Sequence, residues 1–288
     1  MTKKQDICKA NIEEFDNSDN YNETHVFEGM QKVLEEDIQE VISSFKRDNL
    51  KIIDIACGTG VLTKIIFNKT KKSKIYCLDI SKRMLSHLKE RLSKEELKRS
   101  KFICSDAFDY FIKSKEKFDL ITVHGSLHHF FDYLDVIDIA SKKLKPHGIF
   151  FIAGEPLPRE KYNYYIDQTL RLWDRAFKEY KHNKFKQIAY ILYAPFNFIS
   201  PIVNHKSIKS FKDKILHGTN IDQDKAQLVE YWGYERGLDV DKIKEIFAKN
   251  KLSILKFSGS PHFKINLFNK IENLLHNSSC FMLSAVKK

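Results

Sequence analysis

The sequence predicts an α/β protein with a mostly parallel sheet and helices on both of its faces. Between residues 51 and 154, short apolar runs of strand length alternate with segments whose apolar residues recur at helical spacing. This alternation is typical of a parallel sheet wrapped by helices. A length of 288 residues and a hydrophobic content of 42% are sufficient for at least one complete core, in one or two domains.

The predicted elements follow one another in a regular order through the first half of the chain. Apolar residues at helical spacing from Glu28 to Phe45 predict an amphipathic helix before the sheet. Strands are predicted over 51–56, 74–79, 101–104, 118–124 and 148–154. Helices are predicted from residue 61 onward and over 82–92, 107–113 and 133–144. Ser81 is a suitable N-cap for the second of these helices, and Pro146 with Gly148 marks the end of the last.

The second half of the chain has a different character. Aromatic residues crowd the segment 157–236, and several of them recur at helical spacing, which predicts a helical insertion. A helix over 240–248 and strands over 251–258 and 280–286 follow it. We therefore expect an N-terminal arm and helix that form a lid (1–48), a ligand-binding core (49–156), a helical cap (157–236) and a segment that completes the sheet (237–288).

The composition excludes several classes of protein. No run of about 18 uncharged apolar residues is present, so no membrane span is expected. The N-terminus lacks the apolar stretch of a secretory signal, which favours a cytoplasmic protein. Five cysteines are widely spaced and form no C-x-x-C pair. This spacing argues against a disulfide framework or a zinc cluster, and no metal site is expected.

Positive charge is concentrated in the predicted cap. The chain has a formal net charge of +11, and residues 161–215 contain 11 Lys or Arg against four Asp or Glu. Such a block could attract an acidic substrate, nucleic acid or a membrane surface. The alternative is that the lysines only coat solvated faces, since the chain is rich in lysine throughout.

Glycines and carboxylates gather where the predicted strands end. Ligands of open parallel sheets lie beyond the carboxyl ends of the strands. Gly58 and Gly60 follow the first strand and allow a tight turn that approaches a ligand closely. Asp79 ends the second strand and is suited to accept hydrogen bonds from ribose hydroxyls. Asp106, after the third strand, could accept from an adenine amine while the Ala107 N–H donates to a ring nitrogen. Together these positions predict a nucleoside with a charged or polar tail.

Two common nucleotide motifs do not fit. The dinucleotide pattern G-x-G-x-x-G would begin at Gly58, but Thr63 occupies the place of its third glycine. The phosphate-binding pattern G-x-x-x-x-G-K-[ST] does not occur in the sequence. A dinucleotide is therefore weakly supported, and a phosphate-binding P-loop is excluded.

Five segments in order make the chain resemble the class I S-adenosylmethionine-dependent methyltransferases. They are DIACGTG (54–60), the acidic Asp79, SDAF (105–108), FDLITVHGSLHHF (118–130) and LKPHGIFFIAGEP (144–156). The resemblance implies a Rossmann-like, seven-stranded sheet whose last strand is antiparallel. It also implies the cofactor S-adenosylmethionine, with S-adenosylhomocysteine as product. His147 stands where the family usually has glycine, and we expect this change to alter a surface turn.

The resemblance assigns eleven residues to the cofactor. Gly58 and Gly60 would pass under its methionine end, which the backbone at His124 and Gly125 would also meet, and Asp54 would orient this loop and help to bind the amino-acid end. Asp79 would hold the ribose. The full set is Asp54, Ala56, Gly58, Gly60, Asp79, Ile80, Met84, Asp106, Ala107, His124 and Gly125.

Four residues are candidates for acceptor contact or catalysis. His128 and His129 are the best candidates for acceptor contact, and His128 is the candidate base, since histidine titrates near neutrality. The alternative is that one of the two, such as His129, packs or bonds backbone. Glu155, at the end of the fifth strand, could orient or deprotonate an acceptor, or could instead form a salt bridge or a cap. Tyr21 could close over the donor, or be a plain surface aromatic.

The acceptor is predicted to be a small molecule methylated on O or N. The loop after the fourth strand reads HGSL, where nucleic-acid amine methyltransferases usually have N/D-P-P-Y/F, and it lacks a cysteine nucleophile. The aromatic cap suits an apolar substrate pocket, and its positive charge suits an acidic substrate; its aromatics could instead form only its own core or a homodimer interface. The alternatives are a tRNA or rRNA methyltransferase and a non-catalytic protein that binds the cofactor.

Overall fold

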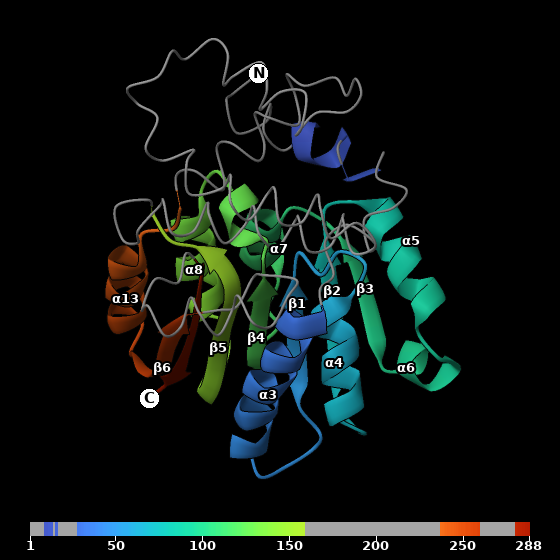
Figure 1. Ribbon diagram of the computed structural model, residues 1–288, viewed down its shortest axis with the longest axis horizontal. Coiled ribbons are helices and arrows are strands. Elements are labelled where there is room, and N and C mark those ends of the chain that lie inside the picture. The colour runs from blue at the N-terminus through green and yellow to red at the C-terminus, as the bar shows by residue number, and fades with distance from the viewer. Residues whose placement is uncertain (1–8, 14, 17–27, 159–236, 260–279) are drawn as a thin grey trace, which may run out of the picture.

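A computed structural model describes residues 9–13, 15–16, 28–158, 237–259 and 280–288 (Figure 1). Tyr21, nearly all of the predicted cap and the basic segment 161–215 lie outside the described residues. In the described part of the chain, no helix combines the length and the apolar character that a membrane crossing would require.

A seven-stranded sheet forms the centre of the molecule, as predicted. Its strands are β1 Lys51–Ile55, β2 Lys74–Asp79, β3 Ser100–Cys104, β4 Phe118–His124, β5 Leu144–Pro156, β6 Leu252–Gly259 and β7 Cys280–Lys287. Their order is β3-β2-β1-β4-β5-β7-β6. The first five strands pair in parallel, and β7 is antiparallel to both β5 and β6. The order reverses between β1 and β4, and this is where an open parallel sheet binds ligands.

Helices cover both faces of the sheet. They are α3 Glu28–Ser44, α4 Val61–Lys69, α5 Lys82–Arg91, α6 Lys94–Lys98, α7 Ala107–Lys113, α8 Tyr133–Ser141 and α13 Val240–Lys249, with a 3-10 turn over Leu127–His129. The sequence analysis missed α6 and the 3-10 turn because both are too short to show an apolar period. A capping box between Ser93 and Glu96 starts α6, and this pattern is a sequence signal for a helix start.

The two faces of the sheet have separate hydrophobic cores. On one face, α7, α8 and α13 bury side chains such as Phe111, Val136 and Phe247 against the sheet. On the other face, α3, α4 and α5 bury Ile38, Ile66 and Leu88. Both cores continue into the sheet, so the strands have apolar residues on both sides, as expected for buried parallel strands.

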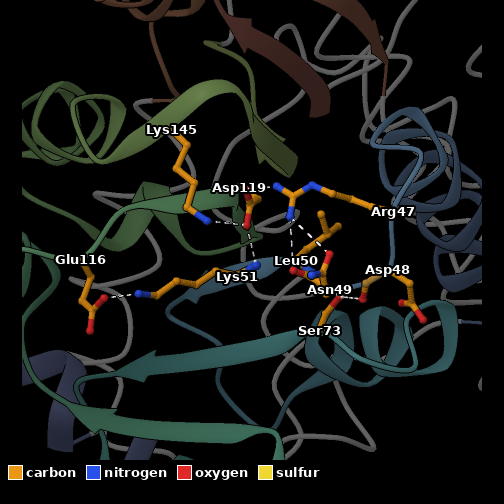
Figure 2. A network of polar contacts seen from close by, with 9 residues as sticks. All are labelled: Arg47, Asp48, Asn49, Leu50, Lys51, Ser73, Glu116, Asp119 and Lys145. Carbon is orange, nitrogen blue, oxygen red and sulfur yellow. Dashed lines mark hydrogen bonds and ion pairs between the residues drawn. The ribbon is translucent and has the colours of Figure 1, made fainter.

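A buried carboxylate joins the amino ends of the central strands (Figure 2). Asp119, at the start of β4, is 2% exposed. It accepts hydrogen bonds from the Lys51 N–H at 2.7 Å, from the Lys145 ammonium at 2.9 Å and from the Arg47 guanidinium. Burial raises the pKa of Asp119, but these donors outweigh burial and hold the pKa below its ordinary value. The contacts fix β1 and β5 against β4 at the end of the sheet remote from the carboxyl ends.

The chain leaves and re-enters the core at one point. The Leu238 N–H donates to the Pro156 carbonyl oxygen at 2.8 Å. Gly237 has φ +62°, and a Cβ there would lie 2.3 Å from the Pro158 nitrogen, so only glycine fits. Residues 158 and 237 therefore lie next to each other beside the carboxyl end of β5, and the helical insertion between them stays a prediction.

Candidate active site

A pocket lies at the carboxyl ends of β1, β2, β3 and β4. It encloses about 800 Å³, part of which is open to solvent, and its lining residues come from the loops after these four strands and from the N-terminal segment. The lining residues are Asn11, Phe15, Ala56, Gly58, Leu78, Asp79, Ile80, Met84, Ser105, Asp106, Ala107, Gly125, Ser126, His129, Phe130, Phe131 and Asp132. This volume suits a ligand of drug or cofactor size.

The loop after β1 brings backbone to the pocket. Ala56, Gly58 and Gly60 have φ of 50°, 52° and 87°, so the chain turns through left-handed conformations. A Cβ at Gly58 would have no atom within 4 Å, whereas a Cβ at Gly60 would lie 2.1 Å from Leu88 Cδ1. Gly58 therefore faces the pocket, while Gly60 allows α4 to approach α5. The assignment of Gly60 to the cofactor is not supported, since it does not line the pocket.

Asp79 organises the loop as well as the pocket wall. Its carboxylate accepts from the Gly58 N–H at 2.8 Å and from the Ser81 N–H at 2.9 Å, and the residue is 7% exposed. Burial raises the pKa of Asp79, and the bonds from Ser81 and Gly58 offset only part of this effect. Each carboxylate oxygen has a second lone pair. Asp79 can therefore hold the loop and accept from a ligand at the same time.

Asp54 does not reach the pocket. It is 1% exposed, and its two oxygens accept from the hydroxyls of Thr63 at 2.5 Å and Thr122 at 2.8 Å. Burial raises the pKa of Asp54 to about 6, against the lowering effect of the two threonines. The Asp54 carboxylate is therefore not placed for a direct contact with a pocket ligand, and its expected help at the amino-acid end, through water, stays a prediction. Asp54 instead joins β1 to α4 and β4 beneath the loop.

Glu155 holds the loop after β4 from behind. It is fully buried. One oxygen accepts from the Ser126 N–H at 2.7 Å and the Leu127 N–H at 2.9 Å, and the other lies 3.2 Å from the His128 N and 3.0 Å from its Nδ1. Burial raises the pKa of Glu155, but His128 and these N–H groups outweigh it, so the pKa lies below its ordinary value.

These contacts correct the roles expected for Glu155 and His128. A carboxylate with a lowered pKa and four donors is a poor proton acceptor. Its position matches the alternative of a salt bridge or cap. The His128 side chain is 7% exposed and bonded to Glu155, and neither residue lines the pocket. Its neighbour His129 does line the pocket, so the structure reverses the expected order of the two histidines.

His124 also lies behind the pocket wall, next to Gly154. A Cβ at Gly154 would come within 3.0 Å of His124 Nε2, and Gly154 has φ +68°. Burial lowers the pKa of His124, so its ring is neutral near pH 7. The next residue, Gly125, has φ +56° and lines the pocket. Only Gly125 of the expected backbone pair therefore reaches the ligand space.

A short N-terminal segment, residues 9–13, 15 and 16, contributes Asn11 and Phe15 to the pocket lining, and we call this segment the strap. Asn11 Nδ2 donates to the His129 carbonyl oxygen at 3.1 Å. The Phe15 ring meets the His129 ring edge to face, with centroids 5.5 Å apart. The Asp16 carboxylate accepts from the Ser81 hydroxyl, and the Asp16 carbonyl accepts from the Arg83 guanidinium. The strap therefore joins the loops after β2 and β4.

The structure brings together eight of the eleven residues assigned to the cofactor. These eight are Ala56, Gly58, Asp79, Ile80, Met84, Asp106, Ala107 and Gly125. Asp54, Gly60 and His124 lie behind the lining. In the described part of the chain, no group of three or more His, Cys, Asp or Glu side chains is arranged to hold a metal ion.

Several lining residues were not expected from the sequence. They are Asn11, Phe15, Leu78, Ser105, Ser126, Phe130, Phe131 and Asp132. Most are neighbours of the motif residues at a strand end, and this adjacency is a usable signal. Asn11 and Phe15 lie in a polar segment without apolar period, where only contact with the folded core shows their role.

A family model described as a methyltransferase domain matches residues 46–192, just over half of the chain. The chain belongs to this family. The match covers the described strands β1 to β5 and every loop that follows them into the pocket. The sheet order and the antiparallel β7 are those of the class I S-adenosylmethionine-dependent methyltransferase fold.

The chain is distantly similar to several curated proteins. It is 27% identical over 137 residues to a malonyl-[acyl-carrier protein] O-methyltransferase of Priestia megaterium, covering 47% of this chain and 48% of that protein. It is 27% identical over 183 residues to a demethylmenaquinone methyltransferase of Lactococcus lactis, covering 54% and 68%. The chain thus spans about half the length of the malonyl-carrier relative.

Solved methyltransferases have a similar fold. The magnesium protoporphyrin IX methyltransferase of Synechocystis PCC 6803 with bound S-adenosylmethionine has a TM-score of 0.57 at 11% identity, with full coverage of both chains. The plantazolicin methyltransferase BpumL, in complex with a substrate analogue and S-adenosylhomocysteine, has a TM-score of 0.55 at 14% identity, covering 99% of this chain and 98% of that one. At such identities the likeness shows the fold alone.

The buried Asp54 carboxyl should make stability depend on pH between about 4 and 6. Its pKa is about 6 in the folded chain and about 3.9 in the unfolded chain. The contribution of Asp54 to the free energy of unfolding is fully present below about pH 4. It falls by roughly 3 kcal/mol as the pH rises through 6. Asp54→Asn should remove this decline in urea unfolding measured from pH 4 to 8. The exposed Asp109→Asn is the control, and equal pH profiles for wild type and Asp54→Asn would contradict the assignment.

Replacing Glu155 should loosen the loop after β4. Glu155→Gln places an amide N–H group against backbone N–H donors, so we expect unfolding free energy to fall by about 2–4 kcal/mol. Glu116→Gln, at a half-buried ion pair with Lys51, should cost under about 1 kcal/mol. Urea unfolding at pH 7 compares the two variants. Equal losses would show that Glu155 has no special structural role.

Proposed function

We propose that this chain is an S-adenosylmethionine-dependent methyltransferase whose pocket binds the cofactor and whose acceptor is a small molecule. The observation that carries the proposal is the position of Asp79. It ends β2 beside the point where the strand order reverses, it holds the Gly58 loop, and it lines the pocket. A carboxylate at this position suits the two hydroxyls of a ribose.

The charge of the pocket agrees with this cofactor. Three carboxylates line it, those of Asp79, Asp106 and Asp132, and the described lining includes no Lys or Arg. S-adenosylmethionine has a sulfonium and an ammonium against one carboxylate, so its net charge is positive. An acidic pocket of low dielectric attracts such a ligand more strongly than water does. The residues present therefore fit the cofactor.

Individual lining residues fit its parts. Ile80 and Met84 offer apolar surface for the adenine ring. Asp106 caps α7 by accepting from the Asp109 N–H at 3.1 Å, and its remaining lone pairs can accept from the adenine amine. The left-handed turn at Gly58 presents backbone without a side chain to the methionine end.

Methyl transfer requires mainly that the acceptor atom be aligned with the methyl group of the cofactor. The cofactor supplies a methyl group already activated on sulfur. The residues around the pocket would hold the acceptor atom in line and exclude water, and such positioning can supply about 7–11 kcal/mol. A base is required only for an acceptor that starts protonated. His129, together with Phe130 and Phe131, borders the ligand space, and His129 is the candidate base in place of His128.

A small-molecule acceptor fits better than nucleic acid. The described lining combines aromatic rings with carboxylates and contributes no cation to a phosphate backbone. The relatives named above act on a carrier-bound malonyl group and a quinone by their names. An acidic acceptor would depend on the basic residues 161–215, which lie outside the described residues. The choice of acceptor atom, oxygen or nitrogen, stays part of the proposal.

Removing the Asp79 carboxylate should weaken cofactor binding at least about tenfold, since charge-assisted hydrogen bonds contribute about 1.5–3 kcal/mol each. Isothermal titration with S-adenosylhomocysteine compares wild type, Asp79→Ala and the control Asp135→Ala. Asp135 is exposed on α8, so its variant has the same charge change and should bind as wild type. Unchanged affinity in Asp79→Ala would remove Asp79 from the ribose role.

Labelled methyl transfer should separate the three functional classes. We expect wild-type protein with methyl-labelled S-adenosylmethionine to label the small-molecule fraction of a cell extract, and Asp79→Ala to label it far less. Label in RNA, with binding that falls steeply as salt rises, would instead indicate an RNA methyltransferase. Cofactor binding without transfer to either pool would indicate a non-catalytic protein.

A further inference from the structure

The strap contributes a buried polar side chain to the pocket lining. Asn11 is 8% exposed and lines the pocket with Phe15. Its Nδ2 donates to the His129 carbonyl oxygen at 3.1 Å. A carbonyl can only accept, so this contact fixes the orientation of the amide and directs Oδ1 away from His129.

The Oδ1 atom of Asn11 is an acceptor without a donor. It is buried, and no hydrogen-bond partner for it occurs among the residues that the structure describes. Burying an acceptor without a bond costs about 1–3 kcal/mol, and the great majority of buried polar atoms in folded proteins are bonded. A donor group supplied by a pocket ligand would remove this cost.

The anchors of the strap hold Asn11 in place. One end of the strap is bonded to Ser81 and Arg83, just after the residue that ends β2. Asn11 itself is bonded to the loop after β4. The amide therefore shares the pocket lining with Asp79, Asp106 and Gly125. A ligand that contacts all of these strand ends also comes close to Asn11.

We propose that Asn11 Oδ1 accepts a hydrogen bond from a hydroxyl or amine of the bound cofactor, so that cofactor binding fastens the strap over the pocket. This inference rests on the proposed function. The donors that S-adenosylhomocysteine offers are its adenine amine, its ribose hydroxyls and its ammonium group. The Asn11 amide would then bond the loop after β4 through nitrogen and the ligand through oxygen. Asn11 is therefore a cofactor-binding residue that the N-terminal strap contributes.

Two variants of Asn11 separate ligand binding from strap attachment. Asn11→Leu has similar volume and removes both polar atoms. Asn11→Asp keeps an acceptor toward the ligand and also loses the donor to His129. Titration calorimetry with S-adenosylhomocysteine at pH 7.5 should show affinity reduced about three- to tenfold in Asn11→Leu. Asn11→Asp should bind within about twofold of wild type.

The outcomes distinguish this inference from the function on which it rests. Equal affinity in wild type and Asn11→Leu would overturn the inference, and so would equal losses in both variants, because the effect would then arise from strap attachment. No binding of S-adenosylhomocysteine to wild type would overturn the proposed function itself. Methylthioadenosine, which lacks the amino-acid part, locates the donor: an Asn11→Leu effect that persists places it on the nucleoside, and one that disappears places it on the ammonium group.

Discussion

Buried carboxylates that accept backbone N–H groups determine the shape of the pocket. Glu155 accepts hydrogen bonds from the N–H groups of Ser126, Leu127 and His128. Asp79 accepts hydrogen bonds from those of Gly58 and Ser81. A loop at a strand end has N–H groups that no neighbouring strand can satisfy, and leaving them buried without partners costs about 1–3 kcal/mol each. Each carboxylate satisfies two or more of them at once, so the loops after β1, β2 and β4 hold one conformation before any ligand binds.

Glu155 and Asp79 differ in how far their carboxylate oxygens can still accept hydrogen bonds from a ligand. Glu155 is fully buried behind the wall, and its pKa is lowered. Asp79 lies in the wall itself and its pKa is raised, because burial is offset by fewer donors. A carboxylate with unused lone pairs at a pocket surface gains most from a ligand that donates hydrogen bonds. A carboxylate that accepts backbone N–H groups therefore has a structural role at Glu155 on β5, whereas at Asp79 on β2 it is also suited to bind a ligand.

The sequence predicted the sheet well because its signals are local. Periodicity located all seven strands, and Asp79 and Asp106 were placed correctly since residues at the carboxyl ends of parallel strands meet at one edge. The role of Glu155 stayed open between catalysis and a salt bridge or cap, because its three partner residues come from a loop 27–29 residues earlier in the chain. Asn11 was missed because a short polar segment acquires its position only by docking. Contacts across the fold decide these two cases, and no local pattern encodes them.

The DIACGTG segment shows why a motif identifies a family without identifying which residues touch the ligand. Side chains on a strand alternate between the faces of the sheet. Asp54 lies between neighbours that belong to the opposite core, so its carboxylate bonds Thr63 of α4 and Thr122 of β4 under the loop. Gly60 lacks a side chain because Leu88 occupies that space. Only Ala56 and Gly58, between these two supports, reach the pocket. In this motif, Asp54 and Gly60 serve the packing of the neighbouring helices, and Ala56 and Gly58 present backbone to the pocket. The packing positions hold the exposed backbone in place, and the exposed backbone gives the motif its access to a ligand.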